Sequence, residues 1–331
     1  MGPREFDEIA RLFRPLTFGA EEALNLLDDA AVIRQLPGHD LVVTTDAIVQ
    51  GVHALPDEAP HALGQRLLRV NLSDLAAKGA APYAALLAVS WPAAWGAEDR
   101  AAFAAGLGQD LARFGVILLG GDTVSTPGPF QASLTLLGRV PSGTMVRRAG
   151  GAPGHRLLVS GTIGDGWLGL QAARGEGTFP DADRAWLAGR YHRPEPRTDL
   201  AEAVRTACAA AADVSDGLLA DAGHVALASG AAARIALDRI PLSAPAARWL
   251  ARQPDRTAAL LALATGGDDY EIVAAATPAA AASLVGAPHA SAPGSQAIWT
   301  EIGDLGAGEG LSATCDGQAV VIGRAGWSHL K

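Results

Sequence analysis

Short apolar runs alternate with longer amphipathic stretches along most of this 331-residue chain, and this alternation constrains its fold most. Runs of about four to eight apolar residues favour buried strands, whereas apolar residues three or four positions apart favour helices. Their alternation predicts an α/β or α+β architecture rather than a helical bundle or a β-sandwich. We expect strands at 31–34, 41–45, 84–90, 116–119, 133–140, 156–160, 233–237, 271–275 and 298–302, and helices at 60–78, 97–114, 199–211 and 217–228.

A cluster of small and helix-breaking residues, Arg148-Ala149-Gly150-Gly151-Ala152-Pro153-Gly154, follows one of the expected strands. Glycine and proline interrupt regular structure, so the cluster is a candidate linker. The length allows two domains, and 49% hydrophobic residues suffice for a core in each. We therefore predict two domains, residues 1–150 and 151–331.

Charge and cysteine content exclude several classes of protein. The formal net charge is −9 and the pI is near 5.3, which disfavours a nucleic-acid surface because such binding needs clustered Lys and Arg. The two cysteines, Cys208 and Cys315, lie far apart and fit a reducing compartment better than a disulfide scaffold. The first residues lack the apolar core of a signal peptide, and no apolar run approaches the roughly 18 residues that span a bilayer. We expect a cytoplasmic protein without membrane association.

Short acidic motifs recur at separate places in otherwise apolar surroundings. An isolated ionised carboxylate there is costly unless it is paired or holds a metal, and hard divalent cations such as Mg²⁺ prefer oxygen ligands. Helix capping alone would account for one such motif, since Asp213 or Ser215 suits the N-cap of the following helix. The motifs are Asp28-Asp29-Ala30, Thr44-Thr45-Asp46, Asn71-Leu72-Ser73-Asp74, Gly120-Gly121-Asp122-Thr123 and Asp213-Val214-Ser215-Asp216-Gly217.

The helix expected to carry Asp74 gives the clearest local case. Leu63, Leu67 and Val70 recur at helical spacing, and Asp74 continues this apolar stripe. Its carboxylate therefore projects from the core-facing side, either towards a metal or towards a cap or a neighbouring Arg.

The chain lacks the usual lysine-based devices for holding ATP. Its two lysines, Lys78 and Lys331, follow no G-x-x-x-x-G pattern, which excludes a P-loop, and the kinase glycine loop with its strand lysine is also missing. If the protein handles ATP, metal-bound carboxylates, backbone amides and Arg must take over.

The motifs in this order, followed by Gly266-Gly267-Asp268-Asp269-Tyr270-Glu271, resemble the thiamine-monophosphate kinase family. That family belongs to an ATP-binding superfamily with aminoimidazole ribonucleotide synthetase, selenophosphate synthetase and a hydrogenase-maturation protein. The resemblance runs from Glu5 to Trp327. It implies an N-terminal α/β domain that binds ATP and Mg²⁺ and dimerises through its sheet, and a C-terminal α/β domain that closes over the active site.

The implied reaction transfers the ATP γ-phosphoryl group to thiamine monophosphate, giving thiamine diphosphate and ADP. The accepting oxygen is already anionic, so no general base or covalent nucleophile is expected; bridging metals and fixed geometry overcome the repulsion between two polyanions.

The resemblance also implies roles for individual residues. For three positions an alternative stays open: Arg147 offers the same chemistry as Arg148, a purely structural role suits His53, and packing in the core suits Trp327. The implied Mg²⁺ ligands are Asp29, Thr44, Thr45, Asp46, Asp74, Asp122, Asp213 and Asp216; the ATP contacts are Gly121, Asp122, Arg148 and Ser215; the thiamine phosphate contacts are His53, Asp268 and Trp327.

Two positions depart from the family pattern. Leu26 and Leu27 precede the first acidic pair where the family commonly has Gly-x-Gly, so we expect this loop not to use positive φ freely. Asp268 stands where Glu is usual, which shortens its reach by one methylene. The remaining alternatives are another enzyme of the superfamily, above all aminoimidazole ribonucleotide synthetase, and a nucleotide-binding module without turnover.

Overall fold

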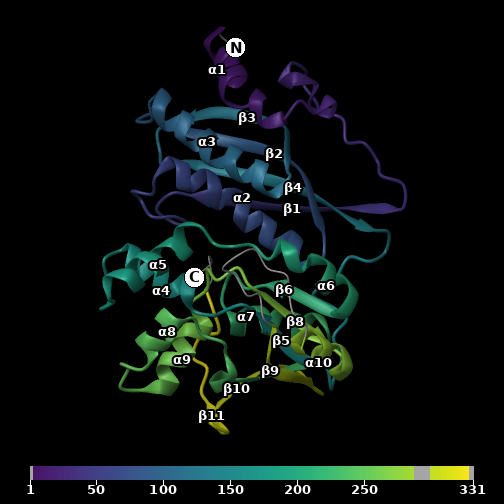
Figure 1. Ribbon diagram of the computed structural model, residues 1–331, viewed down its shortest axis with the longest axis vertical. Helices are drawn as coiled ribbons and strands as arrows, with labels where there is room; N and C mark the ends of the chain where they lie inside the picture. Colours follow the sequence, from purple (N-terminus) through teal and green to yellow (C-terminus); the bar gives the residue numbers. More distant parts are fainter. Residues whose placement is uncertain (1–2, 287–298, 328–331) are drawn as a thin grey trace. The chain divides into compact units, whose positions relative to one another are not determined.

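The computed structural model describes residues 3–286 and 299–327, apart from the side chains of residues 3–5. Its internal contacts divide the chain into two compact units, which are described separately (Figure 1). Of the described residues, unit 1 comprises 3–75 and 80–144, and unit 2 comprises 76–79, 145–286 and 299–327. A domain boundary near residue 150 stays a prediction; the main chain passes from unit 1 to unit 2 after Thr144.

Unit 1 is built around a four-stranded sheet in the order β1-β4-β2-β3. Strand β4 pairs antiparallel with β1 and with β2, and β2 pairs parallel with β3. Helices α2 and α3 lie along the sheet (Figure 1). The elements are α1 (Pro3–Leu12), the 3₁₀ helices η1 (Arg14–Thr17) and η2 (Glu21–Leu26), β1 (His39–Val49), α2 (Pro60–Ala77), β2 (Ala81–Pro92), α3 (Ala97–Phe114), β3 (Ile117–Thr126) and β4 (Gln131–Pro141).

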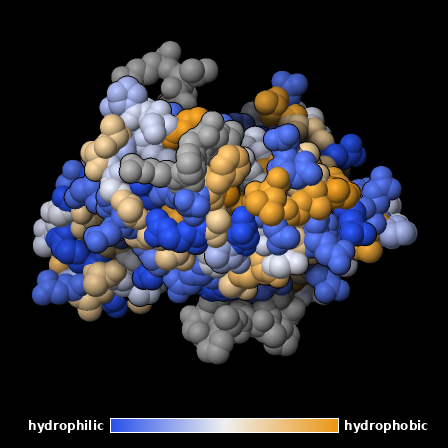
Figure 2. Space-filling model, turned by 90° about the horizontal axis from the view of Figure 1, so that it is seen from above, coloured by the Kyte–Doolittle hydropathy of each residue, from blue (hydrophilic) through white to orange (hydrophobic). Residues whose placement is uncertain are grey.

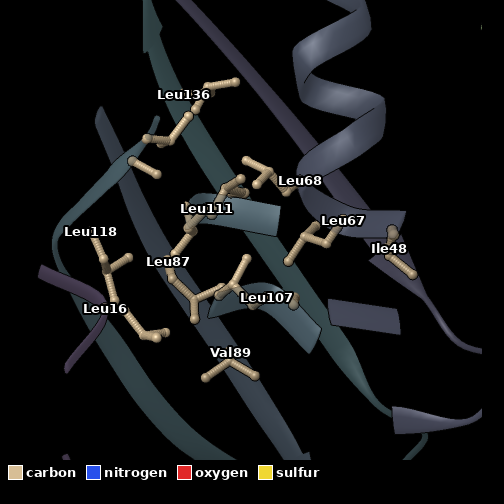
Figure 3. Packing of buried hydrophobic residues seen from close by; sticks show 14 of the residues in the cluster. Leu16, Ile48, Leu67, Leu68, Leu87, Val89, Leu107, Leu111, Leu118 and Leu136 are labelled. Atoms are coloured by element: carbon tan, nitrogen blue, oxygen red, sulfur yellow. The ribbon is translucent and has the colours of Figure 1, made fainter. Parts of the chain in front are cut away.

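The core of unit 1 lies between this sheet and the two long helices. Leu67 and Leu68 from α2 and Leu107 and Leu111 from α3 are buried against side chains from all four strands. Figure 3 shows this packing, with Ile48, Leu87, Val89, Leu118 and Leu136 around the helical leucines. Burial of each such side chain stabilises the fold by about 1.5–3 kcal/mol.

The opposite face of the unit 1 sheet is largely exposed within the chain. Paired residues of neighbouring strands point to the same face, and side chains alternate along each strand. The register places Val43, Leu86 and Val124 on one face, and they are 59%, 37% and 49% exposed. Apolar side chains also gather on the molecular surface viewed from above (Figure 2). The side of the sheet that carries Val43, Leu86 and Val124 is called the outer face below.

Unit 2 contains a seven-stranded mixed sheet in the order β11-β10-β7-β9-β5-β8-β6. Its elements are β5 (Arg156–Ser160), α4 (Asp165–Ala173), α5 (Asp181–His192), η3 (Thr198–Leu200), α6 (Ala201–Ala207), β6 (Ala210–Asp213), α7 (Leu218–Ala228), β7 (Ala232–Ala236), η4 (Leu237–Arg239), α8 (Ala244–Leu250), α9 (Arg256–Thr265), β8 (Ile272–Ala276), α10 (Pro278–Gly286), β9 (Trp299–Gly306), β10 (Gly310–Cys315) and β11 (Gln318–Val320).

Helices cover both faces of this second sheet. Leu157 and Val273 pack in one core with α7, whereas Leu158 and Ala274 pack in another with α6 and α10. Strands buried on both faces have continuous apolar sequences rather than alternating ones. The run Ile272–Ala276 is therefore wholly apolar, and Arg156–Ser160 has three apolar residues in a row at its centre.

The expected α/β class is confirmed, and several elements match closely. The helix expected at 97–114 is α3, and the strand expected at 156–160 is β5. Residues 31–34 form no strand, so that prediction is wrong. The helix expected at 199–211 is also too long, because it ends at Ala207 and the chain enters strand β6. Ile298, the first residue of another expected strand, lies outside the described residues.

Among the described residues, no helix has both the length and the apolar character needed to cross a bilayer.

Candidate active site

In unit 1, three of the proposed metal ligands lie on two regular elements. Thr44 and Asp46 are two positions apart on β1 and point to the side of the sheet that α2 covers, since the neighbouring Val42 and Ile48 are buried there. Asp74 lies in the last turns of α2, on the stripe of Leu63, Leu67 and Val70. The Thr44 hydroxyl donates a hydrogen bond of 2.5 Å to Asp74 Oδ2. The strand and the helix thus bring these oxygen donors together.

Electrostatics mark the same place. Partial burial and the negative charge of Asp74 raise the pKa of Asp46 to about 6. The Asp46 amide donates to Asn71 Oδ1 at 3.1 Å, and the Asn71 amide group donates to the Leu67 carbonyl at 2.8 Å. Asn71 therefore fixes the strand against the helix. Two neighbouring carboxylates of this kind fit a divalent cation, which would relieve their repulsion.

Thr45 and Asp122 lie on the outer face, away from Asp74. The Thr45 hydroxyl is within hydrogen-bond distance of the Ser133 and Thr135 hydroxyls, at 3.3 Å from each. Asp122 is in register with Ala88 and Ser133 and borders a cavity of about 190 Å³. The side chains of the Thr44-Thr45-Asp46 motif are thus divided between the two faces.

Gly121 has a packing reason as well as a proposed role. Strand β2 changes register between Ala85 and Leu86 as it pairs with β3. A Cβ atom at Gly121 would collide with the carbonyl oxygen of Leu87. Only glycine allows the two strands to approach here, whether or not a nucleotide binds beside it.

Asp29 and His53 lie in connecting segments of unit 1. Asp29 is exposed between η2 and β1, where its amide donates to Asp28 Oδ1 at 2.8 Å. His53 lies in the turn after β1, and its Nδ1 accepts from the Val49 amide at 3.0 Å. The proton of the neutral imidazole is therefore assigned to Nε2.

The end of η2, which leads into the Asp28-Asp29 pair, differs from our expectation. Leu24, Asn25 and Leu26 all adopt positive φ, at 48°, 57° and 54°. The loop thus uses the left-handed region although it lacks the glycines of the family pattern. Non-glycine residues bear a conformational cost there.

In unit 2, one buried carboxylate organises the Asp213–Gly217 loop. This loop joins β6 to α7, and the amides of Ser215, Asp216 and Gly217 all donate to Asp221 Oδ2, at 3.1, 3.1 and 3.2 Å. Asp221 is only 2% exposed. Helix α7 has no side-chain cap at its N-cap residue Gly217, so helix capping does not explain Asp213 or Ser215.

The loop that carries Asp268 runs beside the Asp213–Gly217 loop. The Asp268 amide donates to the Ser215 carbonyl at 2.9 Å, and the Tyr270 amide donates to the Val214 carbonyl at 2.8 Å. The Trp327 amide donates to the Asp216 carbonyl at 2.8 Å. Backbone hydrogen bonds therefore bring the nucleotide and acceptor residues proposed for unit 2 into one group.

Trp327 presents its indole to the surface. It is 55% exposed, so core packing does not explain it. The Arg324 guanidinium lies 5.4 Å from the ring centroid, which shows that the ring accepts a cation at its face.

Arg148 is exposed in the segment after β4. Its carbonyl accepts from the Ser229 hydroxyl at 3.3 Å. His224 on α7 feels the charges of Arg148 and Asp216, and its pKa is raised, chiefly by a hydrogen bond with Asp221. Arg148, His224 and Asp216 thus share one electrostatic neighbourhood.

Sequence reasoning missed several polar residues that support these loops. Asp221 lies in the first turn of α7, where an acidic residue also suits the helix dipole. Asp269 and Glu271 are buried within the same motif as Asp268. The available signal was the concentration of acids in the Gly266–Glu271 segment, which exceeds what substrate contact alone requires.

Comparison with known families identifies both parts of the chain. Residues 27–140 match the family "AIR synthase related protein, N-terminal domain", and residues 152–316 match "AIR synthase related protein, C-terminal domain". The chain is 53% identical over 327 residues to the thiamine-monophosphate kinase of Caulobacter vibrioides, covering 99% of this chain and 91% of that protein.

Solved structures agree with these sequence matches. The crystal structure of thiamine-monophosphate kinase from Stenotrophomonas maltophilia is 34% identical with a TM-score of 0.80, and the match covers 95% of this chain and 97% of that one. AaThiL, solved in complex with AMPPCP and TMP, is 28% identical with a TM-score of 0.77, over 90% and 89% of the two chains.

Proposed function

The chain belongs to the thiamine-monophosphate kinase family, and we infer that it transfers the γ-phosphoryl group of ATP to thiamine monophosphate. An oxygen of the acceptor phosphate forms a bond to the γ-phosphorus while the bond from that phosphorus to the β–γ bridging oxygen breaks. The products are thiamine diphosphate and ADP. The acceptor phosphate is largely ionised near neutral pH, so no group of the protein has to remove a proton from it.

The observation that carries this proposal is the convergence of three segments in unit 2. The Asp213–Gly217 loop, Asp268 and Trp327 are joined by backbone hydrogen bonds. Carboxylates for a nucleotide-bound metal thereby lie beside a carboxylate and an exposed aromatic face, which suit the cationic rings of thiamine.

We assign Mg²⁺ binding to oxygen donors in each of the two units. In unit 1 the side chains of Thr44, Asp46 and Asp74 form the best-supported group. Thr45 takes part through its main chain, because its hydroxyl is engaged on the outer face. Bound Mg²⁺ would neutralise the charge on the phosphates. The full proposed set is Asp29, Thr44, Thr45, Asp46, Asp74, Asp122, Asp213 and Asp216, in which the Asp122 side chain lies apart from Asp74, on the outer face.

The remaining site residues bind the two substrates. Gly121, Asp122, Arg148 and Ser215 contact ATP, with the Arg148 guanidinium suited to phosphate oxygens. His53 donates from Nε2 to the acceptor phosphate, since its Nδ1 is held by the Val49 amide. Asp268 and Trp327 bind the cationic part of thiamine monophosphate.

We also propose that two copies pair through the outer face of the unit 1 sheet. The support is the apolar row of Leu41, Val43, Leu86 and Val124, which is 37–59% exposed within one chain and forms an apolar patch on the outer face. Light scattering of V43R should give a monomer where the unmodified protein gives a dimer; an equal mass for both would contradict this pairing.

A reducing compartment suits the protein, and we propose the cytoplasm. Cys208 and Cys315 are both free thiols, as expected where disulfides do not persist.

The direct test is incubation of pure protein with ATP, Mg²⁺ and thiamine monophosphate, followed by chromatography. We expect thiamine diphosphate and ADP in equal amounts. ATP consumption only with the aminoimidazole ribonucleotide precursor would transfer the assignment to that synthetase, and ATP binding without any product would indicate a module without turnover.

A further inference from the structure

The segment Gly266–Glu271 has an unusual backbone. Asp268 and Tyr270 both adopt positive φ, at 63° and 53°, directly after Gly267 at 75°. Asp tolerates the left-handed region, but a bulky aromatic residue rarely enters it. Such conformations persist only where the surrounding structure enforces them. The side chains that enforce this one therefore determine where Asp268 lies.

Asp269, between the two left-handed residues, is held at both carboxylate oxygens. Oδ2 accepts from the Gly164 amide at 2.8 Å and Oδ1 accepts from the Gly166 amide at 2.9 Å, where α4 begins. The side chain is only 1% exposed. A Cβ atom at Gly166 would collide with the Asp268 carbonyl, so this helix end closely approaches the loop.

Glu271 anchors the other end of the segment. Its carboxylate is fully buried and accepts from the Ser160 hydroxyl at 2.7 Å and from Arg197 Nε at 2.6 Å. A second Arg197 nitrogen donates to Oε1, and Arg190 Nη2 lies 3.5 Å from the same oxygen. The buried charge is thus paired in a bidentate arrangement, which fixes both distance and orientation.

These anchors act on Asp268 through short connections. The Asp268 amide is bonded to the Ser215 carbonyl, and the Tyr270 hydroxyl donates to Asp268 Oδ1 at 3.1 Å. A shift of Asp269 or Glu271 would therefore rotate the Asp268 carboxylate and disturb its link to the neighbouring loop.

We propose that Asp269 and Glu271 are positioning residues for thiamine monophosphate, which hold Asp268 in its left-handed conformation and act on the substrate only through it. This inference rests on the proposed function. It gives the Gly266–Glu271 motif a division of roles, in which one carboxylate binds the acceptor and two buried ones set its place.

Asp269→Asn is the first variant to test. Asn places an NH₂ group against one of the two backbone amides that now donate to the carboxylate. Leaving one of these buried amide donors without an acceptor typically costs about 10–100-fold. We expect the KM for thiamine monophosphate to rise at least about tenfold while the KM for ATP changes less than about threefold. Calorimetric titration with thiamine monophosphate should show the same weakening without turnover.

Asp183→Asn serves as the matched control. Asp183 is also an almost buried carboxylate of unit 2, 6% exposed, with two bonds to Arg248 at 2.9 and 2.6 Å, but it joins α5 to α8 and not the loop. Both KM values should stay unchanged in this variant. Equal changes in D183N and D269N would mean that general loosening of unit 2 is responsible, and would overturn the proposal.

A double-mutant cycle separates positioning from an independent effect. If Asp269 acts through Asp268, the D268N/D269N double variant should be no worse than the more impaired single variant. A double variant whose KM for thiamine monophosphate rises by the product of the two single effects would overturn the proposal.

Tyr270→Phe keeps the test open if D269N does not fold. Loss of the hydroxyl bond to Asp268 should raise the KM for thiamine monophosphate about threefold, with the KM for ATP unchanged; unchanged values for both would count against the proposal. Failure of the unmodified protein to use thiamine monophosphate would instead overturn the proposed function and this inference with it.

Discussion

Thr44, Asp46 and Asp74 of unit 1 lie on a strand and a helix, whereas Asp213, Asp216 and Asp268 of unit 2 lie on loops or at a strand end. In unit 1 the periodicity of the elements alone points the side chains to one place. In unit 2 buried carboxylates hold the loops: Asp221 accepts hydrogen bonds from three backbone amides and Asp269 from two. Regular elements position a site directly, and loops need supporting residues.

Asp74→Asn should have the largest effect. The variant removes the charge of a proposed metal ligand beside Asp46 without changing the shape of α2, so the protein should still fold. We expect kcat to fall about a thousand-fold, since a metal supplies several kcal/mol of stabilisation to the transition state. Steady-state kinetics with varied Mg²⁺ measures this, with D99N at the start of α3 as a control. Near-normal kcat would show that Asp74 is structural.

Asp46→Asn should have the next largest effect, on stability. Because its folded-state pKa is about 6, above the ordinary value of about 3.9, ionised Asp46 weakens the metal-free fold above pH 6 and has little effect below pH 4. D46N should therefore raise the free energy of unfolding by about 2–3 kcal/mol at pH 7.5 in EDTA, but not at pH 4.

Urea denaturation at the two pH values checks this prediction. Asp40→Asn on the same strand is the control, because a hydrogen bond from the Gly143 amide lowers the pKa of Asp40 and its replacement should not stabilise the protein. A gain for D46N that is independent of pH would contradict the electrostatic account. The unmodified protein should also gain stability with Mg²⁺, and D46N should gain less.

Asp221→Ala probes the support of a loop in unit 2. Three amides lose their acceptor, and such losses around a metal site cost about 10–100-fold. We expect the KM for ATP to rise about tenfold and the KM for thiamine monophosphate to rise less, because Asp268 and Trp327 bond this loop through its carbonyls. D221N, which keeps an acceptor oxygen, should be milder. The same shift in both substrates would show that the two loops are not independently supported.

The smallest effect distinguishes two neighbouring threonines. Thr44→Val removes the hydroxyl that bonds Asp74 and should lower kcat/KM about fivefold, as expected for one hydrogen bond of about 1 kcal/mol. Thr45→Val changes a hydroxyl on the outer face and should alter kcat/KM less than about twofold. A larger loss from T45V would show that the Thr45 side chain belongs to the active site.

Local patterns predicted the elements of unit 1 better than those of unit 2. The stripe of Leu63, Leu67 and Val70 identified α2 and the orientation of Asp74, because one face of that helix packs on a sheet. In unit 2 the alanines of β6 favour helix in isolation, yet Ala210–Asp213 is a buried strand beside β8. Tertiary packing decides such a run, and single-sequence patterns do not contain it.

Among the site residues, the acidic motifs were visible in the sequence but their support was not. Nothing local distinguishes Asp268, whose amide bonds the neighbouring loop, from Asp269, whose carboxylate bonds the start of α4 more than 100 residues away. The division of Thr44 and Thr45 between two faces follows from strand alternation once β1 is known to include both. The left-handed conformation of Leu24–Leu26 was not predicted, because the segment contains no glycine.

The central claim is direct phosphoryl transfer to thiamine monophosphate, and ATP labelled in its γ-phosphoryl group tests it most directly. After a single turnover with Mg²⁺ and thiamine monophosphate, the label should be in the terminal phosphoryl group of thiamine diphosphate, one for each ADP formed, with none on the protein. Label released as inorganic phosphate, or bound covalently to the protein, would contradict the account.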